Sequence, residues 1–349
     1  MNGDYGIGLN ERQDWIDFAK GIGIILVVWA HTRGSFTSYI VQFHMPLFFF
    51  ISGYLYKYKG EKVKDYINKK AKALLVPFWF WNLLLYPVFY ILYYWGNWNV
   101  LVAIKEVIEI VLTLYKVPFL GATWFLAALF WISISVNVAI SFLKENSYCD
   151  YVLLTLSIIV TVIGFNITFP YKVSRIMICS LFYVLGYMFK KYIHGYVVPC
   201  VKNIGLLVSV ILFWLVASNN SAAMGSNQYS NKILFIIGAL AGTVVVLRVS
   251  ELVLRYGSNN LVVKHITYIG KNSMDIVIWQ FLAFRFAILL QIMFDGASIK
   301  DLVAYPVYDA SGIWLFINVL AGIYGSLMWR YILNHNPLTP FMKKIYVLR

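Results

Sequence analysis

Long apolar runs recur along the whole chain, and short polar segments separate them. Each run is about 17 to 25 residues long, which is the length that an α-helix needs to cross the hydrocarbon core of a membrane. Irregular backbone cannot face lipid, so we expect these runs to be helices rather than isolated strands. The pattern predicts an all-α polytopic membrane protein with about ten transmembrane helices in one bundle. The predicted spans are 15–36, 39–56, 73–95, 122–143, 151–168, 174–190, 201–218, 231–249, 274–293 and 310–331.

The composition agrees with this pattern. Apolar residues make up 61% of the chain and charged residues 13%, with a mean hydropathy of +0.72. Soluble domains carry about a quarter charged residues. We therefore expect a single membrane domain over 1–349, with a cytoplasmic segment at 1–14 and a cytoplasmic tail at 333–349. The three cysteines show no C-x-x-C spacing, so neither a disulfide framework nor a metal site is predicted.

The net charge of +14 would suggest a nucleic-acid partner in a soluble protein, but here its distribution indicates topology instead. The segment 57–72 carries seven of the lysines. In contrast, the segment 219–230 has no charged residue, and the segment 294–309 has one lysine against three aspartates. Because lysine and arginine concentrate in cytoplasmic loops, we expect both termini in the cytoplasm. We expect a lipid bilayer as a partner and no nucleic acid.

Two segments fit the pattern of spans less well. Residues 100–119 form an apolar stretch that Lys105, Glu106 and Glu109 interrupt, which favours an amphipathic or re-entrant helix on the outer side. If this stretch spanned the membrane, every later loop would be inverted. The segment 57–72 is either a juxtamembrane helix on anionic lipid or a phosphate-binding site.

Three ionisable residues lie close together in the first predicted hairpin. Ionisable groups at membrane depth are costly, so His31, Arg33 and His44 together indicate a functional site. The turn between the first two spans is short, so we expect both imidazoles at a similar depth, facing one shared cavity. Imidazole is suited to take a proton from a hydroxyl and later return it. A buried guanidinium needs an anion, a carbonyl group or water as a partner. In the alternative interpretation, these groups only hydrogen-bond helices together.

Lys20 and His31 are eleven residues apart, which corresponds to about three helical turns and places them on one face, about 16 Å apart. A long extended ligand with the shape of coenzyme A would bridge that distance. Asp17 lies about 21 Å from His31 along the same helix and cannot orient the imidazole. We expect Asp17 to pair with a lysine at the cytoplasmic surface.

Five segments carry a resemblance to a known family: RQDWIDFAKGIGIILVVWAH, QFHMPLFFFISGYLY, KKAKALLVPFW, TWFLAALF and IGKNSMDIVIW. Together they resemble the acyltransferase 3 family of integral membrane acyltransferases, and more closely its branch of fucose 4-O-acetylase-like proteins. The resemblance covers most of the chain and is most specific in the first hairpin. It also implies a bacterial origin.

In that family, the first helix carries a basic residue followed eleven positions later by a histidine, and here this signature falls on Lys20 and His31. The resemblance implies that His31 is essential for acyl transfer. A basic pair at the entry to the third helix is matched by Lys69 and Lys72, which would help to hold the acyl donor. Lysine in place of the common arginine keeps the point charge but loses the bidentate geometry.

Two further positions follow from the resemblance. It adds a weak case that Trp124, at the start of the fourth predicted helix, lines the acceptor path. Many family members also place a histidine in the ninth helix, whereas this chain has Gln280 in that neighbourhood. This departure excludes proton transfer by residue 280.

The sequence thus predicts an O-acyltransferase of the bacterial inner (plasma) membrane. It would move acetyl from acetyl-CoA, a co-substrate rather than a bound cofactor, to a hydroxyl of a cell-surface or lipid-linked glycan. His31 would act as the base, and Arg33 or His44 would stabilise the oxyanion. An acetyl-imidazole intermediate stays open, as does the oligomeric state. The competing classes are a multi-pass transporter or channel, against which no inverted repeat is visible, and a catalytically silent interaction protein.

Overall fold

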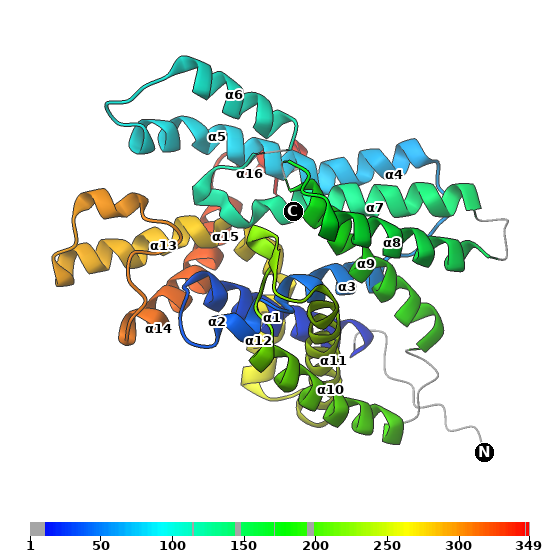
Figure 1. The fold of residues 1–349 in the computed structure, drawn as a ribbon. Helices are drawn as coiled ribbons and strands as arrows, with labels where there is room; N and C mark the ends of the chain where they lie inside the picture. The colour runs from blue at the N-terminus through cyan, green and yellow to red at the C-terminus, as the bar shows by residue number, and fades with distance from the viewer. Residues whose placement is uncertain are drawn as a thin grey trace.

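The computed structural model describes residues 11–113, 115–143, 148–170, 172–193, 199–345 and 347–348, so most of the predicted segment 1–14 lies outside the described residues. Helices dominate these ranges (Figure 1). The first half contains α1 Glu11–His31, α2 Thr37–Ile40, α3 His44–Leu55, α4 Val63–Lys70, η1 Ala71–Leu75, α5 Val76–Tyr93, α6 Val100–Val111, η2 Pro118–Thr123, α7 Trp124–Leu143 and α8 Cys149–Asn166. The second half contains α9 Val173–Met188, η3 Phe189–Ile193, α10 Pro199–Asn219, β1 Ala222–Ala223, η4 Met224–Ser226, β2 Gln228–Tyr229, α11 Lys232–Gly257, α12 Leu261–Lys271, α13 Ser273–Asp295, η5 Ile299–Val303, α14 Ile313–Leu320, η6 Ala321–Gly325, α15 Ser326–Asn334 and α16 Thr339–Lys344.

Seven helical stretches of the described chain are long and apolar enough to cross a membrane, and the apolar part of α10 is shorter. These stretches are Val63–Tyr93, Pro118–Leu143, Cys149–Asn166, Val173–Ile193, Lys232–Gly257, Ser273–Asp295 and Ile313–Asn334. The chain is therefore an all-α, multi-pass membrane protein, as predicted. The total of ten spans and the cytoplasmic position of both termini stay predictions.

The first hairpin differs from the prediction. α1 ends at His31 rather than at residue 36, and Arg33 and Phe36 both adopt a positive φ in the turn that follows. α3 begins only at His44 and has 12 residues, a rise of about 18 Å against a hydrocarbon core of about 30 Å. Ten of its residues are buried. α3 is therefore surrounded by protein, which explains why so short an apolar helix is tolerated here.

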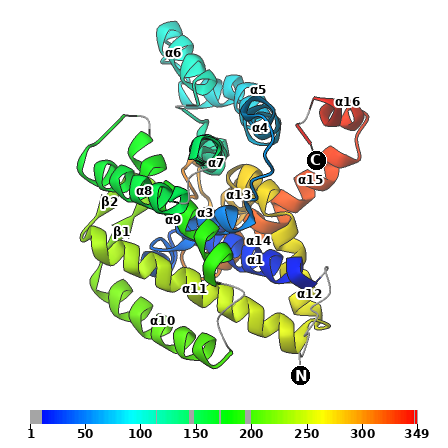
Figure 2. The same ribbon diagram turned by 90° about the vertical axis from the view of Figure 1, so that its right-hand side faces the viewer.

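Close contact with α9 holds α3 at the centre of the bundle, as Figure 2 shows. A Cβ atom on Gly53 would lie 1.8 Å from the carbonyl oxygen of Tyr183, and one on Gly186 would lie 2.0 Å from that of Phe50. Only glycine permits this approach of two backbones, and small residues at crossings are typical of helix packing in membranes. The crossing fixes the helix that carries one wall of the site described below.

The segment 100–119 forms a helix that does not span. α6 runs back beside α5 at the edge of the molecule (Figure 1) and has 12 residues, too few to cross a hydrocarbon core of about 30 Å. The carboxylate of Glu106 accepts hydrogen bonds from the hydroxyl groups of Tyr86 on α5 and of Tyr94, the residue that follows α5, at 3.0 and 3.1 Å. This agrees with the expected amphipathic helix.

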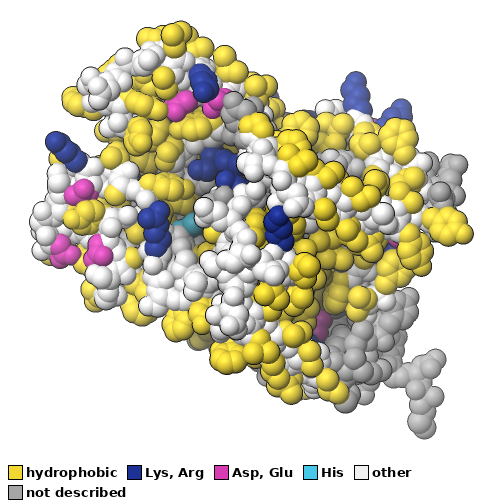
Figure 3. Space-filling view, viewed as in Figure 1, with side chains coloured by type: hydrophobic (Ala, Val, Ile, Leu, Met, Phe, Trp, Pro, Cys, Tyr) yellow, Lys and Arg dark blue, Asp and Glu magenta, His cyan; other side chains and the backbone are white. Residues whose placement is uncertain are grey.

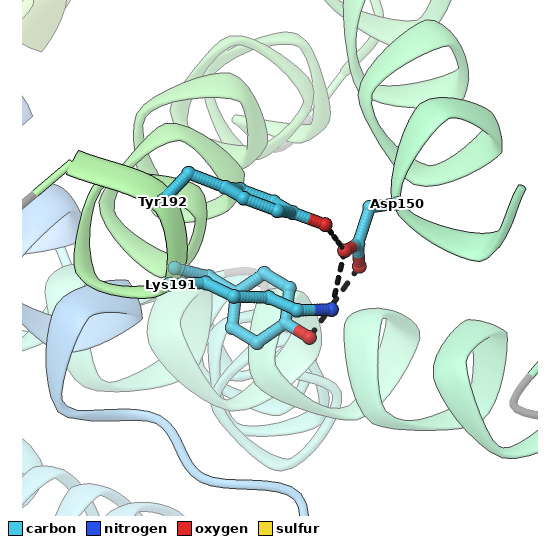
Figure 4. Close-up of polar contacts among 4 residues, drawn as sticks. Asp150, Lys191 and Tyr192 are labelled. Atoms are coloured by element: carbon cyan, nitrogen blue, oxygen red, sulfur yellow. Dashed lines mark hydrogen bonds and ion pairs between the residues drawn. The ribbon is translucent and has the colours of Figure 1, made fainter. Parts of the chain in front are cut away.

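A buried carboxylate joins α8 to the end of α9 (Figure 4). Asp150 lies in the first turn of α8 and is 8% exposed. Lys191 and Tyr192 of η3 donate hydrogen bonds to it, and Tyr187 of α9 donates a longer one of 3.5 Å. Burying a charge is tolerated when it is paired and hydrogen-bonded, as it is here. The contact anchors η3 against α8.

Candidate active site

His31 is the last residue of α1 and is half-buried against α13. Its Nδ1 lies 2.9 Å from Oε1 of Gln280, and its ring packs on Phe281 with centroids 4.7 Å apart. A carbonyl oxygen can only accept a hydrogen bond, so the hydrogen sits on Nδ1 and Nε2 keeps its lone pair. Gln280 is fully buried, and its amide Nε2 has no hydrogen-bond partner among the described residues. The imidazole is thus held in one orientation with a basic nitrogen free.

A small cavity lies against His31. Its volume of about 20 Å³ is roughly the room that one water molecule needs. Trp124, the first residue of α7, lines it together with His31, so two of the predicted site residues meet. The remaining walls come from Val27, Met45, Phe48, Ala122, Phe125 and Val277. Within the described ranges, no group of three His, Cys, Asp or Glu side chains could hold a metal ion.

Arg33 is not the buried guanidinium that the sequence predicts. It is exposed in the turn after α1, with a φ of 59°, because the helix ends two residues before it. Its charge acts on Tyr305, in the segment between α13 and α14. Burial raises the pKa of Tyr305 to about 12, and the guanidinium groups of Arg33 and Arg285 oppose that rise. Arg33 therefore belongs to the turn above the site rather than to the depth of His31.

His44 is buried as predicted, but its contacts differ from the expected ones. Its Nδ1 donates a hydrogen bond to the carbonyl oxygen of Ile40 at 2.9 Å. The described walls of the cavity include Met45 and Phe48 from the same helix but not His44. His44 nevertheless lies within electrostatic range of His31, so the two imidazoles are near each other as expected. The hydrogen bond that the structure gives His44 closes the turn between α2 and α3.

The three predicted donor-binding lysines lie away from the cavity walls. Lys20 forms an ion pair with Asp17 at 2.6 Å, which confirms that Asp17 pairs with a lysine and not with His31. Lys69 lies in the last turn of α4, with its ammonium group 3.9 Å from the carboxylate of Glu61. Lys72 lies one residue into η1, at the entry to the long apolar helix α5. Their role in donor binding stays a prediction.

Two residues of α13 matter more than the sequence indicated. Gln280 is the direct partner of His31, and the signal for it was its place near the position where the resemblance implies a histidine. Arg285, central in the same helix, donates to the backbone carbonyl groups of residues 281, 302, 304 and 306 at 2.5–3.2 Å. These bonds satisfy the guanidinium and hold the segment that follows α13, including Tyr305, against the helix.

Comparison with known proteins identifies the family of this chain. The family described as an acyltransferase domain, Acyl_transf_3, matches residues 13–325. Two curated relatives are nodulation proteins NolL, from Mesorhizobium japonicum (30% identity, covering 39% of this chain and 38% of the relative) and from Sinorhizobium fredii (35% identity, covering 23% and 26%). The chain thus aligns with well under half of either relative. No solved structure matches. The family match covers most of the chain, including His31, Trp124 and Gln280, and the chain belongs to the acyltransferase 3 family.

Proposed function

We propose that this membrane acyltransferase transfers an acetyl group from acetyl-CoA to a hydroxyl of a cell-surface or lipid-linked glycan, with His31 as the catalytic base. One observation carries the proposal. Gln280 accepts the Nδ1 hydrogen of His31, which leaves Nε2 unprotonated, and His31 is one of the residues that line the cavity. A general base must present such a nitrogen within reach of the proton that it removes.

The reaction follows from this arrangement. The acceptor hydroxyl gives its proton to Nε2 while its oxygen attacks the thioester carbonyl. The tetrahedral intermediate then collapses, the carbon–sulfur bond breaks, and the leaving sulfur takes the proton back from the imidazolium. Throughout, Oε1 of Gln280 accepts the hydrogen bond from Nδ1, so the ring neither turns nor changes tautomer. Gln280 is a positioning residue in this scheme.

The cavity supports acetyl as the transferred group. Its walls include Met45, Phe48 and Trp124, and its room is close to that of one water molecule. A short acyl group requires only a small displacement of these side chains. A longer acyl chain would have to displace large rings in a packed interior, which is costly. We therefore expect acetyl-CoA to react faster than succinyl-CoA or longer thioesters.

For the donor, we propose that Lys20, Lys69 and Lys72 hold the phosphates of acetyl-CoA on the cytoplasmic side of a bacterial inner membrane. Lysine supplies a compact point charge suited to phosphate. The thioester would then extend along α1 from Lys20 toward His31, as the eleven-residue spacing allows. The lysine asymmetry of the loops supports this orientation of the chain.

The test is acetyl transfer by purified protein from labelled acetyl-CoA to candidate glycans, comparing wild type with His31→Ala. We expect a loss of about 10²- to 10⁴-fold in kcat, the usual contribution of a general base. His265→Ala is the matched control, since His265 is exposed on α12 and contacts Tyr324. A normal rate in His31→Ala would refute the assignment. Solute flux in proteoliposomes without loss of the thioester would support a transporter instead.

A further inference from the structure

Three cations gather near His31 from two separate parts of the chain. Lys116 lies two residues before the start of η2. Lys172 directly precedes α9, and Arg175 lies in the first turn of α9. We call these three residues the cation cluster. Their mutual repulsion is strong enough to change the titration of both lysines. Figure 3 shows lysine and arginine side chains gathered in a hollow of the surface, with a histidine side chain beside them.

The members of the cation cluster have no acidic partner in the part of the chain that the structure describes, since none of the three forms an ion pair with a carboxylate there. Burial, with repulsion from Arg175, lowers the pKa of Lys116 to about 8. Burial, with repulsion from Lys116 and Arg175, lowers the pKa of Lys172 to about 7. Half-buried positive charges without compensation are costly, and perturbed groups of this kind concentrate at functional sites.

A chain of ring contacts links the cation cluster to His31. The His31 ring packs on Phe281, and Phe281 stacks on Tyr305 with centroids 5.1 Å apart and an interplanar angle of 6°. The ammonium group of Lys116 lies over the Tyr305 ring, 5.6 Å from its centroid. A Cβ atom on Gly121 would lie 2.6 Å from the Tyr305 hydroxyl, so η2 is pressed closely against this ring. A group bound by the cluster would therefore lie beside the base.

We propose that the cation cluster binds a negatively charged group, a carboxylate or a phosphate, on the acceptor glycan and so places a neighbouring hydroxyl at His31. This inference rests on the proposed function and names the class of acceptor. Charge-assisted hydrogen bonds from lysine and arginine are the usual means of holding such groups. Tyr229 lies close to Arg175 and has a buried hydroxyl group with no partner in the described chain, a further polar group available to a ligand.

The positions along α9 favour the acceptor over the acetyl-CoA phosphates. The cation cluster lies at the start of this helix, whereas Lys190, just beyond its end, is within repulsive range of Lys57 in the lysine-rich segment. α9 has 16 residues, a rise of about 24 Å. The start of the lysine-rich segment 57–72 therefore lies near the end of α9, and the cation cluster lies at its other end. Two of the lysines that we propose for the donor phosphates, Lys69 and Lys72, belong to this segment.

The experiment measures binding to the purified full-length protein with three probes: glucose, glucuronate and glucose 1-phosphate. We expect one or both charged sugars to bind about 10- to 100-fold more tightly than glucose, the usual range for hydrogen bonds to a charged group. The two charged probes distinguish a carboxylate from a phosphate. Lys116→Gln and Lys172→Gln should each reduce the preference by about 10-fold. Lys116→Arg and Lys172→Arg, which keep the charge, should retain it. Lys300→Gln, an exposed lysine in η5, is the control and should change nothing.

Three results would overturn the inference. In the first, glucose binds as tightly as the charged sugars. In the second, the Gln variants keep the preference while they remain folded. In the third, the Gln variants bind coenzyme A more weakly and bind the charged sugars as tightly as wild type does, which would assign the cluster to donor binding. Failure of the proposed function has a separate signature: His31→Ala would transfer acetyl groups at the normal rate, whatever the sugar preference.

Discussion

Several lysines at one end of the bundle have carboxylate partners, whereas the three cations near His31 have none among the described residues. At the end where α1 begins, Lys20 pairs with Asp17 at 2.6 Å and Lys271 with Asp14 at 2.9 Å, and Lys191 is bound to Asp150. The Trp15 ring contacts the Tyr54 ring, and the ammonium group of Lys190 lies over the same Tyr54 ring. The start of α1 and the end of α9 therefore meet there. We call this the paired end. At the histidine end, where α1 finishes, the cation cluster of Lys116, Lys172 and Arg175 has no such partner among the described residues.

The difference separates charges that support the fold from charges that await a ligand. A lysine with a carboxylate partner contributes to the packed structure at little net cost. A cluster of half-buried cations lowers stability, so its presence beside His31 is best explained by a ligand that supplies the negative charge. Arg285 is stabilised in a third way, because its guanidinium group donates hydrogen bonds to four backbone carbonyl groups instead of pairing with a carboxylate.

The largest effect should follow from breaking the hydrogen bond between Gln280 and the base, His31. Gln280→Leu removes the acceptor for Nδ1 of His31, so the ring can take the wrong tautomer or turn. We expect kcat to fall by about 10²- to 10⁴-fold with little change in either KM, by analogy with loss of the orienting group in a catalytic triad. Gln280→Glu keeps an acceptor at the same place and should recover part of the rate. Equal loss in Gln280→Leu and Gln280→Glu would show that the glutamine only packs the core.

At the paired end, the next test asks whether Lys20 serves the donor or only Asp17. Lys20→Met should raise the KM for acetyl-CoA by about 10-fold and leave kcat nearly unchanged, because it removes one charge–phosphate contact. Asp17→Asn should act in the opposite direction and lower that KM a few-fold, since it frees the ammonium group. Donor kinetics that stay constant in both variants would make this pair purely structural.

Much of the fold follows from sequence because membrane insertion leaves few choices. Runs of about 20 apolar residues must be helices, and α7, α8, α9 and α13 lie close to their predicted ranges. The first hairpin was predicted less well. The first span was predicted to extend to residue 36, but α1 ends at His31 and Arg33 and Phe36 adopt positive φ values in the turn that follows. Periodicity alone does not reveal such a turn, which is why Arg33 was placed too deep.

The site was predictable only where one helix carried it. His31 stood out as a costly group at membrane depth, and Lys20 followed from its spacing on the same helix. Gln280 and the cation cluster required long-range packing. Nothing local to residue 280 indicates that it meets residue 31, and Lys116 lies in a segment whose own pattern predicts an interfacial helix. Contacts between distant elements decide these positions, and a single sequence does not contain them.

The pH dependence of acceptor binding offers a test of smaller amplitude. Lys172 and Lys116 titrate with pKa values lowered to about 7 and about 8, so both are charged at pH 6 and mainly neutral at pH 9. The groups around them are Arg175 on α9, Tyr305 after α13 and His31 on α1, and none of these is acidic.

We therefore expect the KM for an anionic acceptor to rise several-fold between pH 6.5 and pH 8.5, because the cluster loses charge over that range. Lys172→Arg should move the rise to higher pH, since a guanidinium stays protonated there. A neutral acceptor provides the control, and its KM should stay flat. If the KM for the anionic acceptor also stays flat in wild type, the two lysines do not contact the bound anion.

The smallest expected effect is on thermal stability, and it compares the two ends directly. Lys191→Met at the paired end should destabilise the protein, whereas Lys172→Met in the cation cluster should stabilise it. Lys191→Met leaves the buried carboxylate of Asp150 without its cation, and we expect a loss of about 1 kcal/mol, or a fall of roughly 1–3 °C in the thermal midpoint. Lys172→Met removes an uncompensated charge and should raise the midpoint. The pKa of Lys172 falls from 10.5 to about 7 in the folded protein, so its charge lowers the free energy of unfolding. This destabilisation has its full size below pH 7 and becomes smaller as the pH rises toward 10.5. Lys172→Met should therefore raise the thermal midpoint more at pH 6 than at pH 9. A thermal midpoint that falls at both pH values would mean that Lys172 makes a stabilising contact in the folded protein.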